Sequence, residues 1–230
     1  FFKASPLTVQ HLRPRYIQGW ADMGSSLYRG TWKSSALAAK FFDVSGNLLE
    51  SLEYQEVARF AELLDTLSHK SSDLAADCLL LGQHVLPQIG EDRLPFIKLS
   101  HAVAESNWRD VKGCFEHISR VLTNVAQEQR SRFLDLAAML AQGGLSNMSL
   151  FLSESSSSLA RVESTSQGNI LDMAEKLLPI SHEAVGAFIR SGPELLVKIS
   201  QLQLESWFET GMGILDENRD GGLAYFKVES

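Results

Sequence analysis

The sequence predicts an all-α fold, organised as an α-solenoid of about six helical hairpins with a period of about 37 residues. Three observations lead to this prediction: helix breakers are scarce, apolar residues recur at helical spacing, and large apolar residues recur at a nearly constant interval. Only 6 prolines and 16 glycines occur in 230 residues, so long stretches of the chain can remain helical. We expect a single helical-repeat domain over residues 1–230.

Apolar stripes appear in several segments. Phe60, Leu63, Leu64 and Leu67 stand at i, i+3, i+4 and i+7, which places them on one face of a helix. The same spacing recurs over residues 133–140 and 170–177. These segments are therefore predicted to be amphipathic helices that bury one face.

The interval between large apolar residues, here called anchors, is 18 to 22 residues. Nine of the thirteen anchors are aromatic, where the 9% aromatic composition would place about one. One interval accommodates a helix and a connection, so two intervals make a hairpin. The anchors are Phe2, Trp20, Phe42, Phe60, Leu79, Ile97, Phe115, Phe133, Leu152, Ile170, Phe188, Trp207 and Phe226.

Alternate anchors begin a shared pattern, with further stripe positions three, four and seven residues later. We call the helices that carry it first-kind helices; their anchors are Trp20, Phe60, Ile97, Phe133, Ile170 and Trp207. The segments Trp20-Ala21-Asp22-Met23-Gly24-Ser25-Ser26-Leu27 and Trp207-Phe208-Glu209-Thr210-Gly211-Met212-Gly213-Ile214 resemble the tetratricopeptide pattern Trp-x-x-Leu-Gly-x-x-Tyr. That resemblance implies a right-handed stack of helical hairpins used for binding proteins.

A second resemblance concerns the C-terminal segment. Its residues are similar to the Trp…Gly…Ala-Tyr-Phe…Ser motif of helical repeats that precede the von Willebrand A domain in bacterial partners of MoxR-type AAA+ ATPases. The resemblance implies a helical regulatory arm of an AAA+-linked chaperone machine. The residues that carry it are Trp207, Gly211, Asn218, Ala224, Tyr225, Phe226 and Ser230.

Composition narrows the range of partners and settings. The net charge is −7 and no long basic cluster occurs, so we expect neither nucleic acid nor membrane binding. Two cysteines without a recognisable framework favour a reduced, cytoplasmic setting.

The segment Phe1 to Ser5 is similar in sequence to residues 41–45, and Phe226 to Ser230 keeps the same Phe-to-Ser spacing. Both ends would then fall within a repeat, and we expect a segment of a longer protein.

Three short motifs could carry metal or catalytic chemistry. Residues 216–223 match the start of a calcium loop, but Lys227 stands where a bidentate glutamate should complete the shell, so a helix connection is favoured. Cys114 and His117 share a helix face without a second ligand pair, which favours a buried thiol. His101 is expected to be a core or interfacial histidine, with Glu105 as a neighbour one turn away.

Two further motifs are read as connections. The serine run over residues 155–158 lacks a base that could activate a nucleophile, and is expected to be a flexible loop and helix cap or at most a phosphorylation target. Gly143-Gly144 and Gly221-Gly222 are expected to be breakers between helices. No cofactor is predicted.

A partner-binding face follows from the repeat. Residues one, five and eight after each first-kind anchor would line the inner surface of the stack, and these are strongly apolar in the second half of the chain. Such a face either binds an amphipathic partner helix, seats another domain of the same protein, or is buried by internal packing. The candidate residues are Leu134, Ala138, Leu171, Leu178, Phe208, Met212 and Leu215.

The function predicted from the sequence is a non-catalytic protein-binding scaffold or adaptor. The alternative is the regulatory arm of an AAA+/von Willebrand A-linked machine. A helical metal enzyme is a weaker alternative, because di-iron bundles need Glu-x-x-His pairs and the sequence has none.

Overall fold

The computed structural model describes residues 51–227 and, before them, residues 17, 18, 21, 24, 25, 38, 39, 41, 42 and 48. Every regular element in these residues is helical, which confirms the all-α prediction. The anchors Phe2 and Trp20, the segment Phe1 to Ser5 and the motif residue Ser230 lie outside the described residues.

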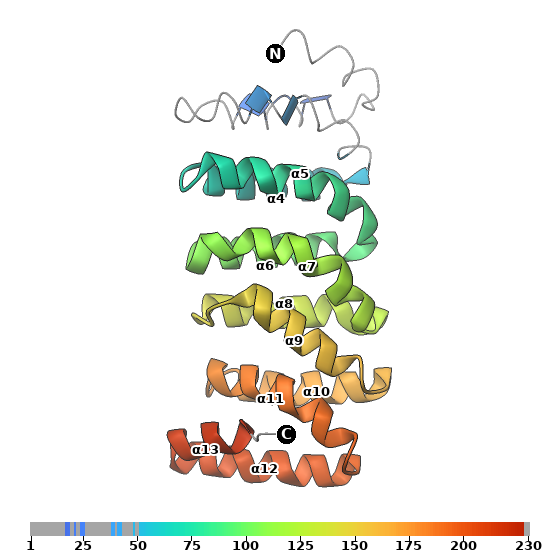
Figure 1. Cartoon of the computed structure of the whole chain (residues 1–230), viewed down its shortest axis with the longest axis vertical. Helices are drawn as coiled ribbons and strands as arrows, with labels where there is room; N and C mark the ends of the chain where they lie inside the picture. The colour runs from blue at the N-terminus through green and yellow to red at the C-terminus, as the bar shows by residue number, and fades with distance from the viewer. Residues whose placement is uncertain are drawn as a thin grey trace. The chain divides into compact units, whose positions relative to one another are not determined.

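Short connections join consecutive helices (Figure 1). Serine and asparagine caps begin several of them: the Oγ atom of Ser181, for example, accepts a hydrogen bond from the Ala184 amide at 3.2 Å. The helices are α4 (Tyr54–Ser68), α5 (Ser72–Gln88), α6 (Arg93–Asn107), α7 (Val111–Asn124), α8 (Arg130–Gln142), α9 (Met148–Leu159), α10 (Ser164–Leu177), α11 (His182–Leu196), α12 (Gln201–Glu217) and α13 (Arg219–Phe226). Three 3₁₀ turns lie between helices at Gly90–Asp92, Trp108–Asp110 and Gln127–Gln129.

The chain forms two compact units, Phe1–Ser119 and Arg120–Ser230, and the boundary falls within α7. In the first unit α4 packs against both α5 and α6. Its core contains Phe60, Phe96 and Phe115, with the last two rings edge to face at 4.8 Å between centroids. Glu56, only 8% exposed, pairs with Arg93 at 3.1 Å, so this buried carboxylate has its counterion.

In the second unit each helix from α8 to α11 packs against the next helix but one, and most of these helices also pack against the next. Helix α11 illustrates this arrangement, since it contacts α9, α10, α12 and α13. Gln167 joins three segments of this unit: its Oε1 atom accepts from the Ala126 amide and its Nε2 atom donates to the Leu159 carbonyl, both at 2.9 Å. The side chain is 4% exposed, and these bonds satisfy its buried amide.

Each anchor in the described residues lies on a helix of its own. All of them are buried except Trp207, which is half-buried. The positions that follow the anchors on α4, α6, α8 and α10 are buried as well, apart from the half-buried His101. The predicted amphipathic stripes are therefore confirmed for these helices, while the 37-residue solenoid repeat stays a prediction.

Aromatic anchors pack over glycines of the neighbouring helix. A Cβ atom at Gly82 would lie 2.5 Å from the Phe60 ring, and one at Gly24 would overlap the Phe42 ring. Because glycine has no side chain, the ring can lie directly against the helix backbone. The close contact between the two helices therefore depends both on the aromatic anchor and on the glycine that it packs against.

Two expected connections are helical. The serines at 155–158 belong to α9, where the hydroxyls of Ser156 and Ser157 both donate to the Ser153 carbonyl. Such bonds satisfy the hydroxyls without unwinding the helix. Gly221 and Gly222 lie inside α13. A Cβ atom at Gly222 would collide with the Leu215 backbone, so glycine there lets α13 approach α12 closely. The prediction of a loop and a breaker at these two places is wrong.

Candidate functional site

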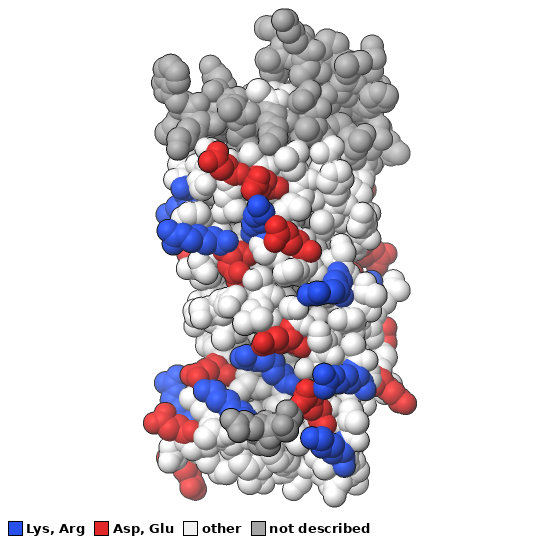
Figure 2. All heavy atoms as spheres, in the orientation of Figure 1, with Lys and Arg blue, Asp and Glu red and all other residues white. Residues whose placement is uncertain are grey.

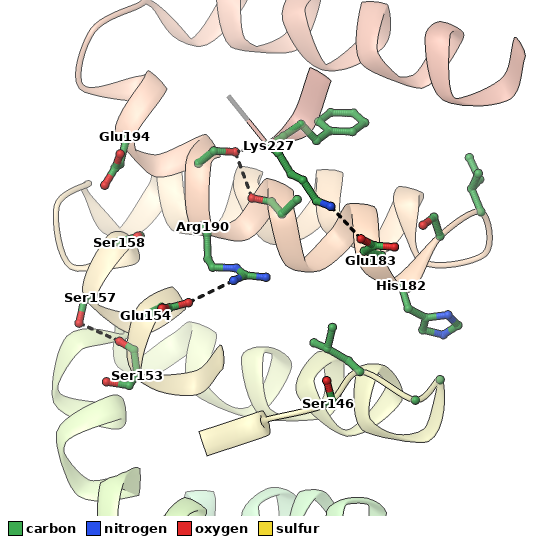
Figure 3. A pocket seen from close by; sticks show the side chains of 18 of the residues that line it. Ser146, Ser153, Glu154, Ser157, Ser158, His182, Glu183, Arg190, Glu194 and Lys227 are labelled. Carbon is green, nitrogen blue, oxygen red and sulfur yellow. Dashed lines mark hydrogen bonds and ion pairs between the residues drawn. The ribbon is translucent and has the colours of Figure 1, made fainter. Parts of the chain in front are cut away.

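A cleft of about 1200 Å³ lies on the second unit, lined by α9, α11 and the end of α13. Figure 3 shows side chains reaching into it from α9 and α11 and from Lys227, just after α13. The connections between α8 and α9 and between α10 and α11 complete its wall, including Gly143, Ser146 and Ile180. The glycines at 143 and 144 follow the end of α8, as predicted for a breaker.

Three ion pairs line the cleft. Arg190 on α11 pairs with Glu154 on α9 at 3.2 Å, and Arg161 pairs with Glu194 at 2.7 Å. Lys227 pairs with Glu183 at 2.8 Å. Most of these side chains are about half exposed, so the pairs add little to stability. Together they place charges of both signs around the cleft.

The electrostatics of Glu183 follow from its neighbours. Its carboxylate accepts a hydrogen bond from Lys227 and feels the positive charges of Lys227 and Arg219. These interactions hold the pKa of Glu183 below its ordinary value. The carboxylate is therefore charged at neutral pH, and the cleft presents anions as well as cations to a partner.

Serine hydroxyls form the second kind of lining group. Ser157 donates to the Ser153 carbonyl at 2.8 Å, and Ser153 in turn accepts from Arg120 at 2.8 Å. Ser191 lies 2.8 Å from the Phe226 carbonyl, which ties α11 to the end of α13. A main-chain carbonyl or a guanidinium cannot remove the proton of a hydroxyl, so these contacts orient the serines without activating them.

Figure 2 shows Lys, Arg, Asp and Glu side chains interspersed over the face that carries α9, α11 and α13. The cleft has the same mixed character, with four Lys or Arg and three Glu among its lining residues. A surface of this kind suits a partner with hydrogen-bonding groups and charges of both signs.

The residues predicted for the partner-binding face are placed mostly inside the fold. Four of the seven are buried and at most 4% exposed: Leu134, Leu171, Phe208 and Leu215. The other three are half-buried: Ala138, Leu178 and Met212. A partner cannot contact the four buried side chains in this structure, so internal packing accounts for them.

The predicted buried thiol is confirmed. Cys114 and Cys78 are free and fully buried. Burial raises the pKa of Cys78 to about 12 and raises the pKa of Cys114 as well. His117, the other half of the motif, is half-buried. Within the described residues, no group of three or more His, Cys, Asp and Glu side chains could hold a metal ion.

In the segment that resembles a calcium loop, the helix connection favoured from the sequence is present but is confined to Asn218. Helix α12 continues to Glu217, and Asn218 caps α13 by accepting a hydrogen bond from the Gly221 amide at 3.1 Å. The side chains of Asp216 and Asp220 are exposed on the two helices that flank this cap.

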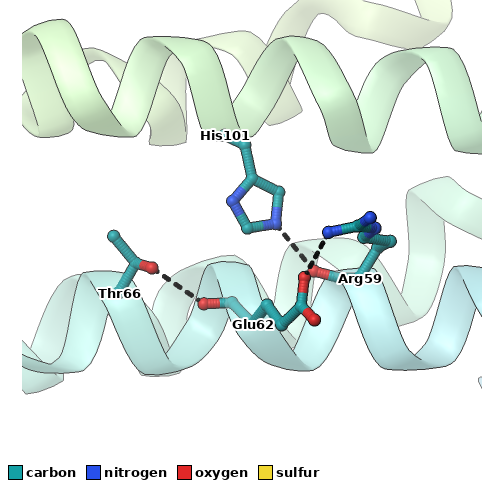
Figure 4. Close-up of polar contacts among 4 residues, drawn as sticks. All are labelled: Arg59, Glu62, Thr66 and His101. Atoms are coloured by element: carbon teal, nitrogen blue, oxygen red, sulfur yellow. Dashed lines mark hydrogen bonds and ion pairs between the residues drawn. The ribbon is translucent and has the colours of Figure 1, made fainter.

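His101 is interfacial, as predicted. Its Nε2 atom donates to the Arg59 carbonyl at 2.8 Å and thereby joins α6 to α4 (Figure 4). Glu105, the neighbour considered from the sequence, is exposed. The hydrogen-bond acceptor is a main-chain carbonyl oxygen, so this contact of His101 is explained by the packing of α6 on α4.

Sequence reasoning missed the cleft. Its ion pairs join residues 33 to 44 positions apart, which is about one hairpin. A search for opposite charges at that separation would have found all three pairs. It would not have found the cleft itself, because a hollow depends on how α9, α11 and α13 pack.

No protein-family model, curated protein or solved structure matches the chain. The resemblances to tetratricopeptide repeats and to helices preceding von Willebrand A domains therefore remain predictions. Among the described residues, no helix combines the length and the apolar character that crossing a membrane requires.

Proposed function

We propose that this protein is a non-catalytic scaffold that binds other proteins, and that the cleft on the second unit receives a polar segment of a partner. The observation that carries the proposal is the lining of the cleft: ion-paired Arg161, Arg190 and Lys227 stand beside their carboxylates and beside serine hydroxyls. These groups offer many hydrogen bonds, and the lining is more polar than apolar.

An extended peptide segment fits this lining better than an apolar helix. Its main-chain amides and carbonyls can bond to exposed groups such as Ser157 and Glu183, and its charged side chains can exchange partners with the existing ion pairs. The serines serve as hydrogen-bonding groups in this proposal, because their contacts provide no base.

The proposed scaffold is a repeat of helical hairpins with a period of about 37 residues. Support comes from the pairing of helices with their second neighbours in the second unit and from hydrogen bonds between residues about one hairpin apart. In such a stack each hairpin presents surface residues in a regular array, which suits the binding of an extended partner.

Affinity capture followed by mass spectrometry tests the proposal. Arg161→Glu reverses one charge at the cleft, and we expect at least one protein captured by the wild-type chain to be lost. Arg59→Glu is the matched control, because Arg59 and Arg161 are 61% and 59% exposed and each has one carboxylate partner. Equal recovery by the wild-type chain and by both folded variants would contradict binding at the cleft.

A further inference from the structure

Ser157 is exposed on the wall of the cleft that α9 forms. Ser153 and Glu154 lie one turn before it, on the same side of the helix. Arg161 lies four residues after it, just beyond the end of α9, and also lines the cleft. Because one helical turn rises only about 5.4 Å, groups bound to these residues lie close to Ser157.

Arginines from α7, α9 and α11 meet at this wall. On α7, Arg120 donates a hydrogen bond to the Ser153 hydroxyl at 2.8 Å. On α11, Arg190 donates to the Glu154 carboxylate at 3.2 Å, and Figure 3 shows its guanidinium reaching into the cleft. Arg161, at the end of α9, is the third. We call Arg120, Arg161 and Arg190 the arginine cluster.

The arginine cluster has hydrogen-bond donors to spare. A guanidinium carries five N–H donors. Within the described residues, the side chains of Arg120 and Arg161 each donate one hydrogen bond. Arg190 donates one to its carboxylate partner and one, at 2.9 Å, to the Gly186 carbonyl. Most of the donors in the cluster can therefore still bond to a ligand.

The charges of the arginine cluster are only partly compensated. Arg161 and Arg190 have one carboxylate each, from Glu194 and Glu154. The partner of Arg120 is an uncharged serine. The cluster therefore carries one positive charge more than the carboxylates that it binds, and an added anion would neutralise it.

Two further carboxylates lie near the arginine cluster along the chain. Glu116 stands one turn before Arg120 on α7, and its carboxylate lies 4.0 Å from the Lys112 ammonium. Glu163 follows Arg161 by two residues, but it is not among the residues that line the cleft. Neither carboxylate forms an ion pair with the arginine cluster in the described residues.

The existing ion pairs can be exchanged for others. Arg161, Arg190 and Glu154 are each about half exposed, so water screens their attraction and the pairs are weak. An incoming anion can therefore replace Glu154 at Arg190 without the cost of breaking a buried pair.

We infer that the arginine cluster binds an anionic group of the partner segment, either the carboxylate of an aspartate or glutamate or the phosphate of a phosphorylated side chain. The anion lies beside Ser157, accepts hydrogen bonds from the guanidiniums and displaces Glu154 from Arg190. Glu154 is thus an internal competitor of the partner. The inference rests on the proposed function and deepens it, because it names the charge of the segment that the cleft receives.

Fluorescence anisotropy with three labelled peptides tests the preference for an anion. Each is a glycine–serine peptide that carries glutamate, phosphoserine or glutamine at the same three positions. The net charge of −7 on the chain disfavours non-specific binding of the two anionic peptides. We expect one of them to bind at least about tenfold more tightly than the glutamine peptide, and the tighter one identifies the anion. Equal binding of all three, or no binding of either anionic peptide, would overturn the inference.

Substitutions with opposite expected effects locate the site. Arg190→Gln and Arg120→Gln each remove a positive charge and should weaken binding of the anionic peptide by about fivefold or more. Glu154→Gln frees Arg190 and should strengthen binding by about two- to fivefold, a gain that loss of structure cannot produce. Arg59→Gln and Glu62→Gln are the matched controls, because they alter an exposed ion pair of the first unit.

The variants also state what would contradict the site. Unchanged binding by both folded arginine variants would overturn the arginine cluster as the binding site. Unchanged or weaker binding by folded Glu154→Gln would overturn its role as an internal competitor. Circular dichroism of each variant shows whether it is folded.

This inference and the proposed function can fail separately. If all three peptides bind equally and Arg161→Glu weakens all of them, the cleft binds peptides without selecting an anion, and only the inference is overturned. If Arg161→Glu loses none of the proteins captured by the wild-type chain, the proposed function itself is contradicted.

Discussion

The ring of Phe226 lies directly over the backbone of Gly211, where an added Cβ atom would stand 2.5 Å from the Cζ atom of the ring. The contact joins α12 to α13. Phe226 also packs edge to face against Trp207 at 5.3 Å, so any shift of its ring disturbs an aromatic cluster.

Replacing Gly211 by alanine is therefore expected to destabilise the fold. The added methyl group overpacks the interface at a cost of about 1–3 kcal/mol, which outweighs the gain of up to about 1 kcal/mol in helix propensity. Gly213→Ala is the matched control, because nothing lies within 4 Å of a Cβ atom there, and it should stabilise by about 0.5–1 kcal/mol. Urea unfolding of both variants measures the difference, and equal effects would contradict this packing.

Ser155 offers a second stability test. Its side chain is fully buried, and its Oγ atom is a buried polar atom without a hydrogen-bond partner in the described part of the chain. Ser155→Ala removes this hydroxyl, and we expect the free energy of unfolding to rise by about 1–2 kcal/mol. Ser100 is the control: it is equally buried but donates to the Phe96 carbonyl at 2.9 Å, so Ser100→Ala should give no such gain. A loss of stability in Ser155→Ala would show that the hydroxyl has a partner.

The Lys227–Glu183 pair predicts a pH dependence. The folded pKa of Glu183 is lowered, first by its hydrogen bond from Lys227 and then by the charge of Lys227. The pair therefore contributes stability above the unfolded pKa of about 4.3, and this contribution is lost as the pH falls through the lower folded value. An NMR titration of the Glu183 carboxyl should show a higher midpoint in Lys227→Met. Lys176→Met, on α10, should leave the midpoint unchanged, and equal midpoints in all three proteins would contradict the pairing.

The cysteines predict a labelling pattern. Both thiols are buried, and burial raises the pKa of Cys78 to about 12, so neither is expected to react with Ellman's reagent in the folded protein. Both should react after unfolding in urea. Leu202→Cys provides the control, since Leu202 is 76% exposed and a thiol there should react at once. Rapid reaction of the folded wild-type protein would show that one of the two buried sites opens.

Much of the fold was predictable because it depends on local spacing. Phe133, Leu136 and Leu140 are buried as their helical positions require, and each described anchor lies on a separate helix. The serines of α9 were mispredicted because serine favours caps and turns by local hydrogen bonding. In the structure, Ser156 and Ser157 use the same bonds within a helix.

The candidate sites were harder to predict. Spacing places Leu171 and Phe208 on a face of the predicted stack, but it cannot say whether a neighbouring helix covers that face. The structure buries both residues. Trp207, assigned as an ordinary anchor, is the one left half-buried.

The sequence by itself determined the amphipathic helices and their anchors, because these follow from which residues recur at i, i+3, i+4 and i+7. It also predicted the buried thiol of Cys114. The tertiary structure alone decided where a partner can reach. Arg190 meets Glu154 across two helices, and this contact places charges of both signs at the cleft. Clefts and uncovered faces arise from how separate helices pack, and spacing along one helix carries no information about its neighbours.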